Sequence, residues 1–411
     1  MRSVWKLGAG ETPSGQEHRS ALSNEAQASA DQGRRQVVGA GGLMAAGWLA
    51  PLRVRAAPAS GEPIRFGQTV ALTGPLAELG QAMHAGAKVG VATVNARGGV
   101  HGRPLTLVTL DDAYDTAKSQ ANVRQLLGEE GCLGLFGCMG TPMIEAMLPQ
   151  LKGSDVACFA PLTGALSTRP KDVRNVLPVR ASYPEEVERL VQHLATLGLR
   201  RIALVTQENA FGQEVAQAAD AALSRHGLGV AARAGVKSDA SNAAQAAGQI
   251  IEASPEAVLL GLAGKPTVGF VKAFRAVRRG TPLYALSVLG SAATLSALGD
   301  DAAGIAVAQV VPLPTSANIK VCREFMQAWQ AAGSTLAPSH LALEGYIDAL
   351  VLAEVLRRCP ATVTRASFLQ TAWSLRSFDV GGFEVGFDAP GKGASRFVDL
   401  TLIGRDGRFI H

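Results

Sequence analysis

Short apolar runs alternate with helical patterns from Ile64 to Phe159. The predicted strands are Ile64–Leu72, Leu105–Leu110, Cys132–Phe136 and Val156–Phe159, separated by predicted helices at Gln81–Asn95, Thr116–Leu127 and Pro142–Leu151. A strand–helix–strand order of this kind is typical of a parallel, doubly wound sheet. The run Leu133–Phe136 has no polar side chain, which fits a strand that is covered on both faces of the sheet.

The same order starts again after Arg180. Ser182 and Glu185 have the spacing of a capping box, and Pro184 lies just inside the predicted helix, which runs to about Leu197. The following strands are predicted at Ile202–Thr206, Val230–Ala234, Ala257–Leu260 and Leu283–Leu286, with helices at Gln213–His226, Ala243–Ala253 and Val268–Val277. Two such units predict an α/β fold with two doubly wound, Rossmann-like lobes.

The last hundred residues or so depart from this order. Val311–Pro314 predicts a crossover between the lobes. Helices are predicted after it at Val321–Ala331, Leu341–Arg358 and Arg365–Ser374. From Phe378 to Ile410 apolar and polar residues alternate between glycine turns, which predicts antiparallel strands.

An export signal is predicted within residues 1–59. Arg34 and Arg35 precede an uncharged run of 17 residues at 36–52, and Ala57-Pro58-Ala59 offers small residues for cleavage. The paired arginines and the glycine-rich, mildly hydrophobic run resemble a twin-arginine signal, with a Sec signal as the alternative. A membrane anchor fits less well, because the run falls short of the ~20 residues that a span needs.

Length and composition allow two domains and exclude wholesale disorder. Of the 411 residues, 47% are hydrophobic and 18% are charged, so a large core is possible. The net charge is +5, but residues 1–59 hold seven Lys and Arg against four Asp and Glu, which leaves only +2 for the rest. We therefore expect no nucleic-acid partner, since export would remove much of the excess charge.

The cysteines give little information about chemistry. There are five, at Cys132, Cys138, Cys158, Cys322 and Cys359. An odd number in an exported protein leaves at least one thiol free or paired between chains, and the spacing leaves the pairing open. No Cys-x-x-Cys occurs, so neither a zinc knuckle nor a thioredoxin-type motif is supported.

Signatures of catalysis and of cofactor binding are missing or incomplete. The sequence contains no Gly-x-Ser-x-Gly and no His-Glu-x-x-His, and Gly264-Lys265 lacks the rest of a phosphate-binding loop. Asp111, Asp112 and Asp115 are compatible with a cation site, but the favoured interpretation is a solvated loop in which Asp115 caps the next helix. We expect no metal site, no cofactor and no enzymatic activity.

Polar loops follow several predicted strands at their carboxyl ends, where open α/β sheets bind ligands. These loops are Thr73–Pro75, Gly137–Pro142, Pro161–Gly164 and Thr206–Gly212. The hydroxyls of Thr141 and Thr163, together with backbone N–H groups at helix N-termini, can bind an anion without a lysine. The plainer alternative is that both threonines only cap helices, and the two roles are compatible.

At these loops the sequence resembles a known family, the periplasmic solute-binding proteins of branched-chain-amino-acid-type (Leu/Ile/Val-binding) ABC transporters. The matching segments, in chain order, are Ala71–Gly80, Asn95–Pro104, Asp111-Asp112, Phe211-Gly212, Leu298–Asp300, Glu344–Ala349, Gly381–Phe383 and Asp406-Gly407. The resemblance covers nearly all of residues 62–411 and implies the type I periplasmic binding protein fold, with two lobes, three crossovers and a ligand between the lobes. We expect the first lobe at 60–180 plus 312–378 and the second at 181–311 plus 379–411.

The resemblance also implies a function. A protein of this family captures a small carboxylate or amino-acid-like ligand in the periplasm and delivers it to the membrane permease of an ABC transporter, without catalysis. A periplasmic ligand sensor built on the same fold is the alternative.

The family's site residues carry over to particular positions. Thr141 and Thr163, with the loop residue Gly140, match the hydroxyl and backbone groups that hold a ligand carboxylate. Leu79 matches a pocket-lining position, and Phe211 stands where a tyrosine is common.

The sequence departs from the family's pattern at two positions that would contact the ligand's amine. The second-lobe loop near Ser287 has no Asp or Glu to bind an ammonium group, and Lys265 stands where the family has an aromatic residue. A buried ammonium without an anionic partner is costly. A carboxylate without an α-amine, aromatic or aliphatic, is therefore at least as compatible with the sequence as an amino acid.

Overall fold

The computed structural model describes residues 60–289 and 291–410, which belong to one compact unit, Arg55–His411. The predicted export signal lies outside the described residues. Within them, no helix is both long enough and apolar enough to cross a membrane.

The first lobe contains a five-stranded parallel sheet with the order β2-β1-β3-β4-β5. Its strands are β1 (Ile64–Val70), β2 (Leu105–Asp111), β3 (Gly134–Phe136), β4 (Cys158–Phe159) and β5 (Val176–Leu177). Its helices are α1 (Ala77–Ala96), α2 (Thr116–Leu127), α3 (Thr141–Leu151), α9 (Lys320–Ala331), α10 (His340–Arg358) and α11 (Arg365–Ser374). Buried aromatic rings fill the core, with Phe66 and Phe159 packed 5.3 and 5.8 Å from Phe368.

The second lobe contains a seven-stranded sheet with the order β14-β13-β10-β9-β8-β6-β7. The parallel strands are β6 (Arg201–Gln207), β7 (Gly229–Val236), β8 (Ala257–Gly261), β9 (Leu283–Ala285) and β10 (Ile305–Gln309), and β13 (Asp399–Ile403) and β14 (Phe409–Ile410) add to them antiparallel. The helices are α4 (Tyr183–Thr196), α5 (Ala210–Arg225), α6 (Ala243–Glu252), α7 (Lys265–Arg275) and α8 (Ala292–Leu298). A small antiparallel hairpin, β11 (Phe378–Asp379) with β12 (Glu384–Val385), precedes β13.

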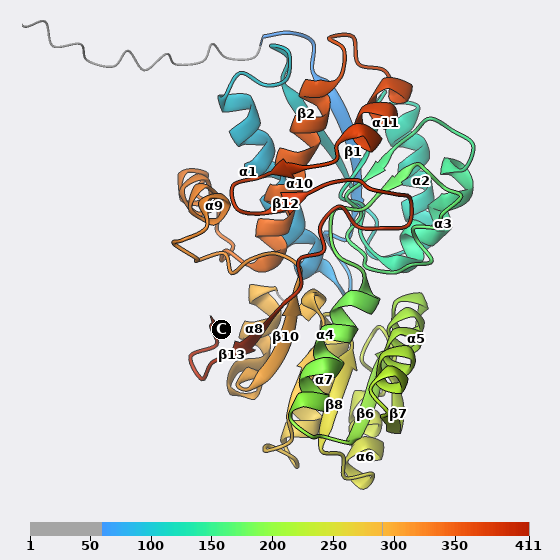
Figure 1. Cartoon of the computed structure of the whole chain (residues 1–411), viewed down its shortest axis with the longest axis vertical. Helices are drawn as coiled ribbons and strands as arrows, with labels where there is room; N and C mark the ends of the chain where they lie inside the picture. Colours follow the sequence, from blue (N-terminus) through green and yellow to red (C-terminus); the bar gives the residue numbers. More distant parts are fainter. Residues whose placement is uncertain (1–59, 290, 411) are drawn as a thin grey trace, which may run out of the picture. The chain divides into compact units, whose positions relative to one another are not determined.

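The chain passes between the two sheets three times. It leaves the first lobe after β5, returns after β10 to form α9, α10 and α11 of that lobe, and leaves it again between β12 and β13. After the second passage, α10 packs along α1 (Figure 1). Glycine allows this close approach, because a Cβ on Gly86 would lie 1.8 Å from the Ala342 carbonyl oxygen and one on Gly345 would lie 2.3 Å from that of Met83.

The predicted fold class is confirmed, and so are several local signals. The Glu185 carboxylate accepts the Ser182 N–H at 2.7 Å, as the capping box predicts. Asp115 caps α2 by accepting the Lys118 N–H at 2.8 Å. The antiparallel C-terminal strands are also present.

Two strands and one α-helix were not predicted: β5, β10 and α8. β5 has only two residues and α8 only seven, too few for a periodic pattern. β10 runs into the apolar segment that predicted the crossover, and all five of its residues are buried, so it shows no alternation. One predicted strand is shorter than expected: of Val156–Phe159, only the last two residues form a strand.

All five cysteines are buried and free. This agrees with the expectation that at least one thiol is free or paired between chains.

Candidate functional site

A small cavity of about 20 Å³ lies between the loops at the carboxyl ends of the two sheets. Residues after β3, β4, β6, β8 and β9 line it, joined by residues from the loops after β1 and β2 and from the start of α4. The lining residues are Leu76, Leu79, Tyr114, Met139, Gly140, Thr141, Leu162, Tyr183, Phe211, Ala263 and Val288. Both lobes therefore contribute to one site, and the space left in it holds about one water molecule.

Two hydroxyls meet beside this cavity. The Oγ1 atoms of Thr141 and Thr163 are 2.8 Å apart, and both residues are buried. Thr141 is the first residue of α3, whose N-cap Gly140 has no side chain to cap the helix. Gly140 has φ of +99°, and a Cβ there would lie 2.4 Å from the Met143 methyl group. The start of α3 therefore has no side-chain cap, and because Pro142 has no N–H, the backbone donors that it offers to an acceptor are those of Thr141 and Met143.

Aromatic rings form one wall of the cavity. Tyr183 and Phe211 contact edge to face, with ring centroids 5.2 Å apart, and they lie at the starts of the neighbouring helices α4 and α5 of the second lobe. Tyr114, from the first lobe, completes this wall. Burial raises the pKa of the Tyr114 and Tyr183 hydroxyls, so both are neutral at pH 7. Among the described residues that line the cavity, none carries a charge.

A buried charge cluster lies behind this wall, centred on Arg180. Its guanidinium donates to Glu186 Oε1 at 3.2 Å and to the Ser287 hydroxyl, and it lies 3.5 Å from Glu344 Oε1. Arg180 leads into the second lobe, Glu186 lies on α4 and Glu344 on α10, so one side chain ties both lobes together.

The charges in this cluster depend on one another. Burial raises the pKa of Glu186 and Glu344, and the Arg180 guanidinium opposes that rise. Burial alone would lower the Arg180 pKa, but the two carboxylates outweigh it and raise the pKa. Burial, with the Glu344 charge, raises the pKa of Asp348 well above its usual value. Asp348 is therefore neutral more readily than an exposed aspartate.

A family model described as periplasmic binding protein matches residues 63–407. The chain belongs to the periplasmic binding protein family. Membership confirms the resemblance inferred from the sequence, implies a periplasmic location, and places the chain in a family of solute-binding proteins rather than enzymes.

Relatives of this periplasmic binding protein carry Leu/Ile/Val-binding names. Leu/Ile/Val-binding protein homolog 7 of Brucella abortus is 27% identical over 189 residues, which are 44% of this chain and 47% of the relative. The chain thus spans about half the length of the curated relatives it matches.

Solved structures match over more of the chain. A substrate-binding periplasmic protein from Ralstonia solanacearum has a TM-score of 0.80 and 31% identity, covering 84% of this chain and 99% of that one. A solute-binding protein of an ABC transporter from R. palustris, solved with benzoate, has a TM-score of 0.74 and covers 85% and 95% of the two chains. Its 19% identity shows the fold alone.

The structure brings together most of the residues predicted to bind ligand in this periplasmic binding protein. Leu79, Gly140, Thr141 and Phe211 line the cavity. Thr163 does not line it but holds the hydroxyl of Thr141 from behind.

The two remaining predicted residues lie elsewhere. Lys265 is exposed at the start of α7 and does not line the cavity, so the structure gives no support to an inward-pointing lysine as a reason to expect an anion. Ser287 is buried next to the lining residue Val288, and its N–H and hydroxyl donate to the Glu186 carboxylate at 2.8 and 3.1 Å.

The loop near Ser287 has no acid of its own, as the sequence indicates, but the structure places the Glu186 carboxylate against it. The acid comes from α4, about one hundred residues earlier in the chain, which inspection of the loop around Ser287 does not reveal. The sequence contains one hint of this contact. Two glutamates, Glu185 and Glu186, stand at the start of the helix, and the capping box needs only Glu185, so Glu186 is left for another role.

The aspartates after β2 organise a loop. Asp111 accepts the N–H groups of Leu72 and Thr73 at 2.8 and 3.2 Å. Asp112 is buried, in contrast to the predicted solvated loop, and accepts the Thr69 hydroxyl and the Tyr114 N–H at 2.8 and 2.9 Å. Burial raises the pKa of Asp112 to about 6. The described residues contain no group of three or more side chains suited to a metal ion.

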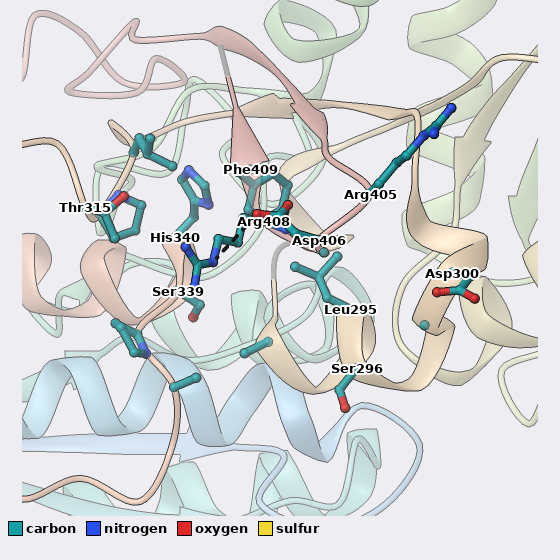
Figure 2. Close-up of a pocket in the computed structure, with 17 residues that line it drawn as sticks. Leu295, Ser296, Asp300, Thr315, Ser339, His340, Arg405, Asp406, Arg408 and Phe409 are labelled. Atoms are coloured by element: carbon teal, nitrogen blue, oxygen red, sulfur yellow. Dashed lines mark hydrogen bonds and ion pairs between the residues drawn. The ribbon is translucent and has the colours of Figure 1, made fainter. Parts of the chain in front are cut away.

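A second, larger cavity of about 950 Å³ shares no lining residue with the first. It lies among α8, the start of α10, the passage near Thr315 and the turn between β13 and β14. Figure 2 shows Arg408 reaching toward Ser339 and His340, whereas Arg405 points away from them. None of the residues predicted to bind ligand lines this cavity.

Proposed function

We propose that this periplasmic binding protein captures a small carboxylate without an α-amine, aromatic or aliphatic, between its two lobes and delivers it to the permease of an ABC transporter. The observation that carries the proposal is the composition of the small cavity: a hydroxyl pair at an uncapped helix N-terminus, apolar walls, and no charged side chain among its described lining residues.

The carboxylate has a place to bind. The N–H groups at the start of α3 and the Thr141 hydroxyl favour an anion, because the helix dipole and the unpaired donors act together. Thr163 supports this arrangement by fixing the Thr141 hydroxyl at 2.8 Å. An anion at this position needs no lysine, in agreement with the exposed position of Lys265.

An α-ammonium group has no comparable partner. The nearest acid to the loop at Ser287 is Glu186, and both of its carboxylate oxygens already accept hydrogen bonds from Ser287, with Arg180 as a further donor. A buried ammonium would have to displace these contacts or remain unpaired, and either costs several kcal/mol. The R. palustris structure solved with benzoate shows that a protein of this fold can hold a carboxylate without an α-amine.

The rest of the ligand would contact apolar side chains. Leu79, Phe211 and Val288 provide surface for a ring or a short alkyl chain. Because the cavity holds only about 20 Å³, such a ligand enters only when the lobes move apart. The three passages between the sheets are the natural hinge for that movement.

A thermal-shift screen of the protein without residues 1–59 tests this function. The panel holds benzoate, 3-phenylpropanoate and 4-methylpentanoate, with phenylalanine and leucine as amine-bearing counterparts. We expect at least one acid to stabilise the protein, by about 2.7 kcal/mol at 100 times its Kd, while its amino-acid counterpart does not. Stabilisation by the amino acids alone would contradict the proposed ligand class.

A further inference from the structure

A carboxylate of the second lobe binds the backbone of the first lobe at the edge of the site. Glu214, on α5, accepts the N–H groups of Leu166 and Ser167 at 3.0 and 3.1 Å. Both amides belong to the loop that follows β4. A carboxylate that accepts two N–H groups forms charge-assisted hydrogen bonds, which are stronger than neutral ones.

The loop that Glu214 holds is internally braced. The Thr163 hydroxyl accepts the Ala165 N–H at 3.2 Å, and the Thr168 hydroxyl donates to the Ala165 carbonyl at 2.8 Å. Arg169 closes the loop by donating to the Thr163 carbonyl at 2.7 Å. The segment from Thr163 to Arg169 is therefore expected to move as one piece.

This loop has three attachments with different roles. At one end, Thr163 holds the Thr141 hydroxyl beside the cavity. At the other end, Arg169 donates to the carbonyl of Arg180, where the chain passes into the second lobe. Between them, the amides of Leu166 and Ser167 are presented to Glu214.

We propose that Glu214 is a closure latch, a positioning residue that binds the loop 163–169 only when the lobes are closed and so couples lobe closure to the hydroxyl pair of the site. The pairing requires α5 and the loop to be in contact, and opening of the lobes separates them. Only the part of this proposal that concerns ligand retention rests on the proposed function.

The latch can be tested without a ligand. A Cβ on Gly264 would lie 2.9 Å from Glu78 Oε1, so the start of α7 and the start of α1 approach each other across the closed cleft. The pair Glu78→Cys and Lys265→Cys puts two accessible thiols at this rim, while the native cysteines are buried. The rate at which a short bis-methanethiosulfonate reagent joins them measures how often the lobes close.

In this background, Glu214→Gln and Glu214→Ala are compared with Glu252→Gln, which removes the same charge from an exposed position on α6. We expect cross-linking to slow about 5- to 10-fold in both Glu214 variants and to stay unchanged in the control. Melting temperatures should stay close to that of the parent, because Glu214 is only half-buried and contributes little to either core. Equal cross-linking rates in the Glu214 variants and the control would overturn the latch.

Ligand retention is measured separately, with benzoate as the probe. We expect Glu214→Gln to release benzoate about 10-fold faster than Glu252→Gln does. Failure of benzoate to bind either protein would exclude benzoate as the ligand, contradict the retention part of the proposal for this probe, and leave the cross-linking result to decide on the latch. If cross-linking slows but benzoate release is unchanged, Glu214 stabilises the closed form only in the ligand-free protein. That result would overturn the proposed coupling between lobe closure and the hydroxyl pair of the site.

Discussion

The hydroxyl oxygens of Thr141 and Thr163 lie 2.8 Å apart, although 22 residues separate them in the chain. They meet because β3 and β4 are neighbours in a parallel sheet, so the loops at their carboxyl ends lie side by side. In this arrangement one hydroxyl donates to the other, which leaves one hydroxyl hydrogen of the pair for the neighbouring Tyr183 hydroxyl or for a ligand oxygen.

Removing either hydroxyl should weaken ligand binding. We expect Thr141→Val and Thr163→Val each to reduce affinity about 10- to 100-fold, since a hydrogen bond to a charged group contributes roughly 1.5–3 kcal/mol. Isothermal titration with the strongest acid from the screen measures the change. Thr401→Val, a buried threonine in the second sheet, is the matched control and should bind normally. Normal affinity in both site variants would exclude the pair from binding.

The Arg180 cluster should be essential for stability. Arg180→Met leaves Glu186 and Glu344 buried without their counter-charge, and breaking a buried pair costs about 3–5 kcal/mol. Arg396→Met removes an exposed arginine paired with Asp388 and should cost at most about 1 kcal/mol. Urea denaturation compares the two.

A second substitution tests the cause of that loss. In Arg180→Met, the further change Glu344→Gln removes one stranded carboxylate and should recover part of the lost stability. If Arg180→Met is no less stable than Arg396→Met, the cluster does not hold the lobes together as described.

His84 should make the protein less stable in mild acid. Burial, with the nearby Lys88 charge, lowers its pKa from 6.5 to about 4, and its Nδ1 lies 2.7 Å from Gln68 Oε1. Because the folded protein resists protonation of the ring, the stability from the neutral ring is fully present above pH 6.5. It is lost as the pH falls from about 6.5 to about 4.

The comparison with His84→Gln isolates this effect, because glutamine does not titrate and all other groups are shared. We expect the stability of the natural protein relative to the variant to fall by about 1–3 kcal/mol between pH 7 and pH 4. A stability difference that is constant across this range would show that His84 is protonated equally in the folded and unfolded chains.

Ligand binding should make the molecule more compact. Two α/β lobes joined by three passages close around a ligand by hinge movement. Small-angle scattering should therefore give a smaller radius of gyration in saturating ligand. Saturation without a change in the radius of gyration would argue against closure.

Short-range patterns in the sequence predict the local features of the fold. The capping box at Ser182, the N-cap at Asp115 and the alternating elements up to β9, apart from β5, follow from spacing alone. Thr141 and Thr163 were also predictable, because the ends of neighbouring parallel strands meet at one edge of a sheet.

The surroundings of the site were not predictable in this way. Glu186 and Glu344 reach Arg180 from helices far apart in the chain, and no local spacing indicates that they meet. Lys265 is a further example. It was matched to a site position by resemblance alone, and the resemblance did not indicate that its side chain faces solvent. Side-chain orientation at a helix start depends on how the helix packs, which the linear pattern does not contain.

The most direct test of the central claim is a matched titration of the protein with leucine and with 4-methylpentanoate. The two compounds share the same branched chain and carboxylate and differ only in the α-amine. We predict that 4-methylpentanoate binds at least about 100-fold more tightly than leucine, which is about 2.7 kcal/mol in binding free energy. Tight binding of leucine with no response to 4-methylpentanoate would contradict the claim that this site holds a carboxylate and excludes an amine.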